Sequence, residues 1–157
     1  MKTDQRDLLC ASHALAHAPV LALAVPVRAE AMAPPPRSRP RAGRQRRALG
    51  DHFGIANFGV NLTRLAPGAM TARRHAHSRQ DEFVFVLQGT LTLVDESGRT
   101  TLTRGMCVGF PAGQGNAHHF VNESNVDAIV LEVGDRSPGD RVRYPDDDVA
   151  ALSIDGA

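Results

Sequence analysis

The sequence predicts an all-β domain, either a sandwich or a closed barrel, over residues 50–148. From Phe58 onward, apolar and polar residues alternate in short runs rich in Val, Thr, Leu and Phe, a pattern typical of half-buried strands. Turn residues, above all Gly beside Pro or Asp, separate these runs. This half of the sequence contains no long amphipathic helical pattern. We therefore expect seven or eight short strands joined by turns.

The expected strands follow in chain order as residues 60–65, 82–87, 90–94, 100–103, 106–110, 118–121 and 128–133. Residues 82–87 are apolar on both faces beyond the first carboxylate. Val84 and Val86 share one face, and Phe83, Phe85 and Leu87 share the other. An apolar outer face needs a cover, which could be a second sheet, the N-terminal segment or another subunit. The simplest self-association is a two-fold homodimer.

Residues 1–49 differ in composition from the rest and are predicted to be an extension outside the folded domain. They are rich in Pro, Arg and Ala and end in a basic run from Arg37 to Arg47. Such a segment buries too little apolar surface to offset the entropy lost on ordering, so we expect it to be disordered or extended. Leu8–Val27 is richer in Ala, Leu and Val and is predicted to form a weak helix. Residues 149–157 are predicted to be a C-terminal tail.

The N-terminal segment shares some features with an export signal. Val20–Val25 is apolar and small residues follow it. However, Asp4 and Asp7 stand where a signal carries basic residues, and Pro26 breaks the end of the apolar run. We therefore expect a cytoplasmic protein, with export through this segment as the alternative. The chain has no run of roughly 20 apolar residues that would predict a membrane-spanning helix.

The charge balance and the cysteines exclude several classes of function. With 18 Lys and Arg against 17 Asp and Glu, the formal net charge is +1, too small to attract nucleic acid or an anionic membrane. The expected partners are small molecules. Cys10 and Cys107 are far apart in the sequence and predict neither a disulfide framework nor a metal knuckle. We interpret Cys107 as a small buried hydrophobic residue.

The residues that suggest chemistry lie in two short windows, and the first contains histidines and carboxylates. His75 and His77 are two positions apart, so on an extended strand both imidazoles share one face and can converge on one ion. Asp81 and Glu82 follow after a polar break. A turn in that break would bring one of the two carboxylates back to the same point.

The second window is the adjacent pair His118 and His119, which follows a Pro/Gly-rich turn. Neighbouring side chains on a strand face opposite ways, so one of the two is expected to point inward as a ligand. A histidine pair on a strand is by itself more often a polar surface or a hydrogen-bonded group than a metal site. The metal hypothesis therefore depends on both windows meeting at one point.

These residues resemble the paired signatures of the cupin superfamily. The first signature, an H-x-H pair and a glutamate between two glycines, is matched in order by Gly68, His75, His77, Glu82 and Gly89. The second is matched by Gly105, Pro111, Gly113, His118 and Asn122. Four residues rather than the usual two separate Gly113 from His118, but the spacing to Asn122 and the strand alternation select His118 over His119. The closing stretch, residues 131–148, is similar to that of small bacterial single-domain cupins of unassigned activity.

The resemblance implies a double-stranded β-helix, the jelly-roll barrel of cupins, over residues 50–148. It also implies one divalent metal ion bound by His75, His77, Glu82 and His118. Three imidazoles and a carboxylate suit Fe, Mn, Ni, Co, Cu or Zn rather than Ca, and the sequence does not distinguish among them. An octahedral ion would keep two positions open for a ligand.

The resemblance leaves several functions open. Cupins include dioxygenases, sugar-phosphate isomerases, lyases and proteins that only bind ligands, and the fold does not choose among them. We expect a metal-dependent enzyme, a dioxygenase, isomerase or lyase, that acts on a small oxygen-bearing metabolite. The alternative is a non-catalytic module that binds or senses a sugar or a signal. No further catalytic residue is identified, although Arg73, Arg74 and Gln114 lie near the motif ends and could contact a substrate.

Overall fold

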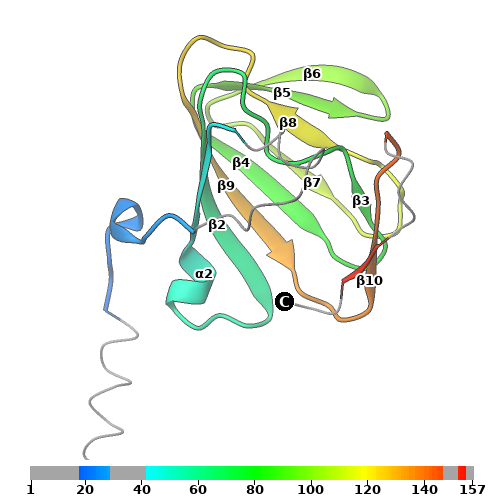
Figure 1. The fold of residues 1–157 in the computed structure, drawn as a ribbon, viewed down its shortest axis with the longest axis horizontal. Helices are drawn as coiled ribbons and strands as arrows, with labels where there is room; N and C mark the ends of the chain where they lie inside the picture. Colours follow the sequence, from blue (N-terminus) through cyan, green and yellow to red (C-terminus); the bar gives the residue numbers. More distant parts are fainter. Residues whose placement is uncertain (1–17, 29–41, 147–151, 155–157) are drawn as a thin grey trace, which may run out of the picture.

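The computed structural model describes residues 18–28, 42–146 and 152–154, and almost all of its regular structure is β-strand (Figure 1). The strands are β1 (Arg44–Ala48), β2 (Phe58–Leu65), β3 (Ala76–His77), β4 (Glu82–Gln88), β5 (Thr90–Asp95), β6 (Gly98–Thr103), β7 (Cys107–Phe110), β8 (His119–Val121), β9 (Ala128–Asp135), β10 (Asp140–Arg143) and β11 (Leu152–Ile154). The described helices are the 3-10 turn η1 (Ala22–Ala24) and the four-residue α2 (Leu49–His52).

The strands form three antiparallel sheets around one interior. A five-stranded sheet has the order β1-β2-β9-β4-β7, and two three-stranded sheets have the orders β6-β5-β8 and β11-β10-β3. In Figure 1 the smaller sheets lie beside the large one and close the barrel with it. The predicted all-β jelly-roll is confirmed, because the seven strands expected from alternation all form, with bounds shifted by a few residues.

The hydrophobic core lies between the sheets and explains the alternation. Val86 and Val130 of the large sheet are fully buried and face Leu91, Leu93 and other apolar side chains of the small sheet β6-β5-β8. These buried positions occur at every second residue, as a strand with one face toward the core requires. Burial of such side chains stabilises the fold by about 1.5–3 kcal/mol each.

Strands form at both ends of the chain where the sequence analysis expected an extension and a tail. Residues 44–48, placed in the extension, form the edge strand β1, which pairs with β2. Residues 152–154, placed in the tail, form β11, which pairs with β10. An arginine-rich run suits an edge strand, because long charged side chains reach water while the backbone hydrogen bonds on one side only. The first half of the predicted helix at residues 8–27 lies outside the described residues, and the described half contains only η1.

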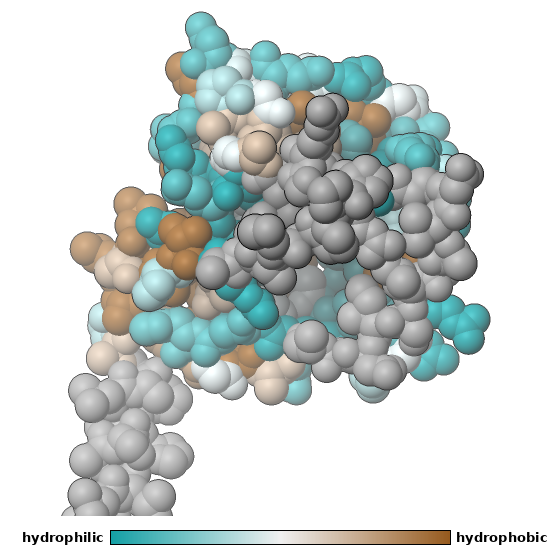
Figure 2. Space-filling model, viewed as in Figure 1, coloured by the Kyte–Doolittle hydropathy of each residue, from teal (hydrophilic) through white to brown (hydrophobic). Residues whose placement is uncertain are grey.

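Residues 18–28 pack against β1 and expose apolar side chains. The Arg28 N–H donates to the Arg46 carbonyl at 2.8 Å, and Val25 is buried. Leu21 and Leu23 are exposed, and Figure 2 shows apolar surface gathered at the left, over η1. No helix in the described ranges has the length and apolar character to cross a membrane.

The turn between β4 and β5 depends on a glycine. Gly89 has a positive φ of 78°, and a Cβ there would lie 2.7 Å from the Asp127 carbonyl oxygen, so the turn between β4 and β5 requires glycine.

The expectation that Cys107 is buried is wrong: its side chain is exposed. Cys107 pairs with Phe85, and both face away from the core.

The structure predicts that β1 contributes to stability although it precedes the expected domain boundary. A chain that begins at residue 51 should unfold at a lower temperature than one that begins at residue 42, because β2 loses the five residue pairs of its edge partner. Thermal unfolding followed by circular dichroism measures the difference. Equal midpoints for the two chains would show that β1 adds nothing.

Candidate metal centre

A short backbone pairing joins the two histidine windows. The His75 N–H donates to the His118 carbonyl at 3.1 Å, and the His118 N–H donates to the His75 carbonyl at 2.9 Å. The ladder continues from Thr71 N–H to the Phe120 carbonyl. Directly paired residues project their side chains to the same side, so the pairing sets these two imidazoles together.

The other two groups come from neighbouring strands. His77 ends the short strand β3, which pairs with β10, and Glu82 begins β4. Glu82 has the same parity as Val84 and Val86, which are buried in the core, so its side chain points into the barrel. The four intervening residues supply the turn that brings this carboxylate back to the histidines.

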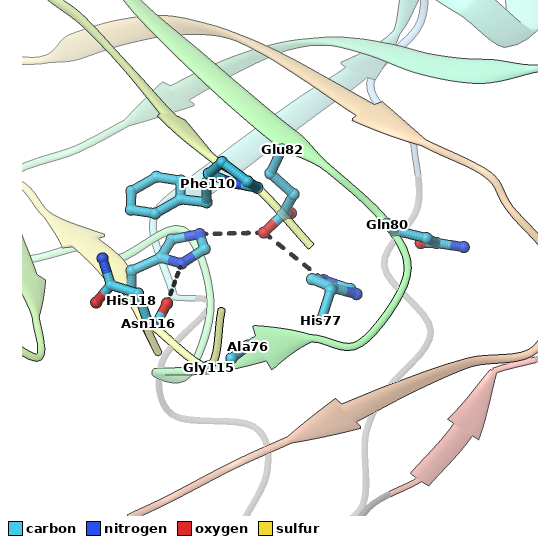
Figure 3. Close-up of a pocket in the computed structure, with 9 residues that line it drawn as sticks. Ala76, His77, Gln80, Glu82, Phe110, Gly115, Asn116 and His118 are labelled. Atoms are coloured by element: carbon cyan, nitrogen blue, oxygen red, sulfur yellow. Dashed lines mark hydrogen bonds and ion pairs between the residues drawn. The ribbon is translucent and has the colours of Figure 1, made fainter. Parts of the chain in front are cut away.

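The four predicted groups meet at one carboxylate oxygen, Glu82 Oε2. Figure 3 shows three of them, His77, Glu82 and His118. The Nε2 atom of His118 lies 3.0 Å from it, and those of His75 and His77 each lie 3.6 Å from it. One ligand atom from each of His75, His77 and Glu82 lies within 4.8 Å of the other two. Because successive residues alternate in direction, His119 belongs to the opposite face of its strand.

Each of the three imidazoles is anchored through its other ring nitrogen. His75 Nδ1 donates to the Arg73 carbonyl at 2.8 Å, and His118 Nδ1 donates to the Asn116 carbonyl at 3.1 Å. His77 Nδ1 donates to the Asp140 carboxylate at 2.6 Å. A carbonyl oxygen can only accept, so the proton of a neutral ring lies on Nδ1 and Nε2 keeps its lone pair.

The arrangement therefore aims three nitrogen lone pairs at a carboxylate oxygen. Glu82 Oε2 is buried, and no hydrogen-bond donor within the described parts of the chain satisfies it. Facing lone pairs repel one another unless a positive charge lies between them. That charge can be a proton on an imidazole or a metal ion, and nitrogen and oxygen donors of this kind fit a transition-metal ion.

The pKa shifts of Glu82 and His75 also favour a positive charge at this point. Burial alone would raise the pKa of Glu82, but His118 and His75 hold it well below its usual range. Burial alone would lower the pKa of His75, yet its interactions with Glu82 raise it above the ordinary value. Metal binding needs a neutral imidazole, so loading should weaken as the pH falls through the raised pKa of His75.

Asp140 supports the site and was not foreseen from the sequence. It is fully buried, holds His77 Nδ1, and accepts hydrogen bonds from the N–H groups of Ser78 and Arg79. Burial alone would raise the pKa of Asp140, but these donors hold it below the ordinary value. A carboxylate behind a histidine ligand fixes the ring and makes it a better donor to a metal. Asp140 is 63 residues from His77, so no local pattern could identify it.

A small pocket opens beside the centre. It has an empty volume of about 210 Å³, part of it open solvent, and its lining includes His77, Gln80, Glu82, Asn116 and His118. Phe110 stacks on His118 with ring centroids 3.4 Å apart, which supports the imidazole from one side (Figure 3). The pocket therefore borders the point at which the imidazoles of His77 and His118 meet Glu82.

The three residues suggested as substrate contacts do not line this pocket. Arg74 instead forms ion pairs with Asp146 at 2.7 Å and with Glu96 at 3.3 Å. The backbone carbonyl of Arg73 anchors His75, and Gln114 is exposed. Asn122, the last position of the second signature, is fully buried and donates to the Leu65 and Val126 carbonyls.

The chain is similar in sequence and structure to proteins of the cupin superfamily. A family model described as a cupin domain matches residues 61–134. A sugar phosphate isomerase from a cupin superfamily, from Silicibacter pomeroyi, is 39% identical, with 87% of this chain and 92% of that chain covered and a TM-score of 0.77. A proposed sugar phosphate isomerase from Acidithiobacillus ferrooxidans is 29% identical over 71% of this chain and 76% of that chain, with a TM-score of 0.64.

More distant structures share only the fold. A polyketide cyclase from Streptomyces resistomycificus is 20% identical, with 82% of this chain and 84% of that chain covered and a TM-score of 0.64. No curated protein matches the chain.

The role of Asp140 can be tested by Asp140→Asn. We expect metal affinity to fall roughly 10–100-fold, because an amide is a weaker acceptor for His77 and turns an N–H toward other donors. A chelator competition titration at fixed pH measures the affinity. The matched control is Asp127→Asn, which removes a partly exposed carboxylate paired with Arg64. Equal affinities for the two variants would contradict the role given to Asp140.

Proposed function

The chain belongs to the cupin superfamily, and on that premise we propose that it is a metal-dependent isomerase of sugar phosphates. The observation that carries the proposal is the convergence of three imidazole Nε2 atoms on one buried carboxylate oxygen. His75, His77, Glu82 and His118 would hold one divalent transition-metal ion. Such an ion supplies Lewis acidity, which polarises a carbonyl or hydroxyl oxygen of the substrate.

The substrate class comes from the relatives and agrees with the site's chemistry. Two structures similar to this chain are described as sugar phosphate isomerases, one at 39% and one at 29% identity. An aldose and its ketose differ only in the position of one carbon-bound and one oxygen-bound hydrogen atom at two neighbouring carbons. The reaction therefore needs no oxidant. A site with a Lewis acid, a carboxylate and a small pocket has what such a reaction requires.

The chain's own residues would hold and orient the substrate. The Nδ1 anchors of the three histidines keep their Nε2 atoms directed at one point, which reduces the reorganisation needed during reaction. Gln80 lines the pocket and donates to the Ser137 carbonyl, so its side-chain oxygen is left to accept from a sugar hydroxyl.

The proposal predicts metal-dependent interconversion of a sugar phosphate. Purified protein should contain about one transition-metal ion per chain. It should interconvert a member of a panel that contains arabinose 5-phosphate, glucose 6-phosphate and mannose 6-phosphate with its ketose, as followed by proton NMR. Glu82→Gln and His118→Ala should lose both metal and turnover. Glu123→Gln, an exposed carboxylate on Arg99, is the control and should keep both.

Other outcomes of the same experiment would replace this function. Oxygen uptake that depends on an aromatic diol or a keto acid would indicate a dioxygenase, and elimination without isomerisation would indicate a lyase. Binding of a sugar phosphate without turnover would favour the non-catalytic sensing module. Full metal content in both site variants would contradict the proposed ligand set.

We also propose that the protein is a homodimer through the outer face of the large sheet. Phe83 and Leu87 are 39% and 40% exposed, and Phe83 is paired with Val133 on the same face. Phe85 and Leu131 extend this apolar surface in the adjoining pair. A flat apolar sheet face can bury itself against its own copy across a two-fold axis.

The dimer proposal is tested by Phe83→Glu. Sedimentation velocity should give two chains for the native protein and one for the variant, because a buried glutamate pair at a two-fold contact is costly. Val126→Glu, which changes an exposed apolar residue in a loop, should stay dimeric. A native monomer would contradict the proposal.

A further inference from the structure

A second carboxylate, Glu132 on β9, points into the barrel near the metal centre. It has the same parity as Val130 and Ala128, which are fully buried in the core. Thr63 Oγ1, also fully buried, donates to Glu132 Oε2 at 2.6 Å. Glu132 is therefore an interior group, and its orientation is fixed by a neighbouring strand.

The register of the sheet sets Glu132 close to Glu82. Glu82 pairs directly with Gly134, and Val84 pairs with Glu132. Glu132 is thus the diagonal neighbour of Glu82 on the same face, a relation in which Cα atoms lie about 7–8 Å apart. At this distance the Glu132 carboxylate does not contact the three histidines. It is near enough to reach a small molecule bound beside Glu82.

The residue of β9 that pairs directly with Glu82, on the same face as Glu132, is a glycine without a side chain. Gly134 stands directly beside Glu82, and a Cβ built there would lie 4.0 Å from Glu82 Cγ. Gly59 follows on the next strand at the same register. Glu132 itself is half-buried.

We propose that Glu132 is the acid–base group that transfers the proton between neighbouring carbons of the substrate, a role that rests on the proposed isomerase function. Its carboxylate takes the proton from the carbon next to the carbonyl, and the electron pair of that C–H bond becomes the C=C bond of an enediol. The carbonyl oxygen gains the hydroxyl proton of the neighbouring carbon. Glu132 then returns its proton to the former carbonyl carbon, so no oxidant or reductant is needed.

The surroundings of Glu132 raise its pKa and so make its carboxylate a stronger base. Burial raises the pKa of Glu132 above its ordinary value, and the nearby negative charge of Glu82 adds to this. Thr63, Arg44 and Arg46 act in the opposite direction without cancelling it. A carboxylate with a raised pKa removes a proton more readily than an ordinary glutamate.

The first test is Glu132→Gln, which keeps the shape of the side chain and an oxygen that can accept from Thr63. Metal content and the affinity for arabinose 5-phosphate should match those of the native protein. Turnover, and deuterium uptake from D₂O into the product, should fall by about 10²–10⁴-fold. Glu123→Gln, on the outer surface of the small sheet, should change neither. Native turnover in Glu132→Gln would overturn the proposal.

A second measurement does not depend on turnover. In protein labelled with ¹³C at its glutamate carboxyls, the Glu132 signal is assigned by its absence in Glu132→Gln. Loading with Mn²⁺ should broaden the Glu132 signal and leave that of Glu123 sharp. An unaffected Glu132 signal would overturn the proposal whatever the substrate. A broadened signal in a protein that isomerises no panel member would reject the isomerase function and support Glu132 as the acid–base group for another substrate.

Discussion

The site depends on the repulsion among four electron-rich atoms that the backbone holds together. Three imidazole Nε2 atoms lie within 3.6 Å of Glu82 Oε2, while their Nδ1 atoms are bound to fixed acceptors. No rotation of a ring can relieve this without breaking one of those anchors. A positive charge at the centre relieves this repulsion. The ligand atoms of His75, His77 and Glu82 are close enough to share one metal ion, whereas a proton satisfies one contact at a time.

The fold makes this geometry by bringing three separate backbone segments together. The mutual pairing of His75 and His118 joins two windows that are more than 40 residues apart. β3 carries His77 beside β10, whose first residue, Asp140, supports it. β4 carries Glu82 at its start and continues into the core with Val84 and Val86. The core thus fixes the strand on which the carboxylate lies, so stability and chemistry share one element.

The proposed ligand residues could be predicted from the sequence because each signature is a local pattern. The residues that hold them in place, such as Asp140, could not. H-x-H spacing indicates His75 and His77, and strand alternation together with the spacing of the resembled cupin signature indicates His118. The contact of Asp140 with His77 and the position of Glu132 beside Glu82 were missed because both come from strand pairing across more than 45 residues. The strand β1 was missed because an edge strand can be built from arginines, which the composition assigned to an extension. Cys107 was misplaced because its strand lies at the sheet edge with that face open to solvent.

X-ray absorption spectroscopy of the Co²⁺-loaded native protein identifies the atoms bound to the ion. We expect a shell of nitrogen and oxygen with the multiple-scattering signature of three imidazoles. A shell with no imidazole scattering would show that the ion binds elsewhere.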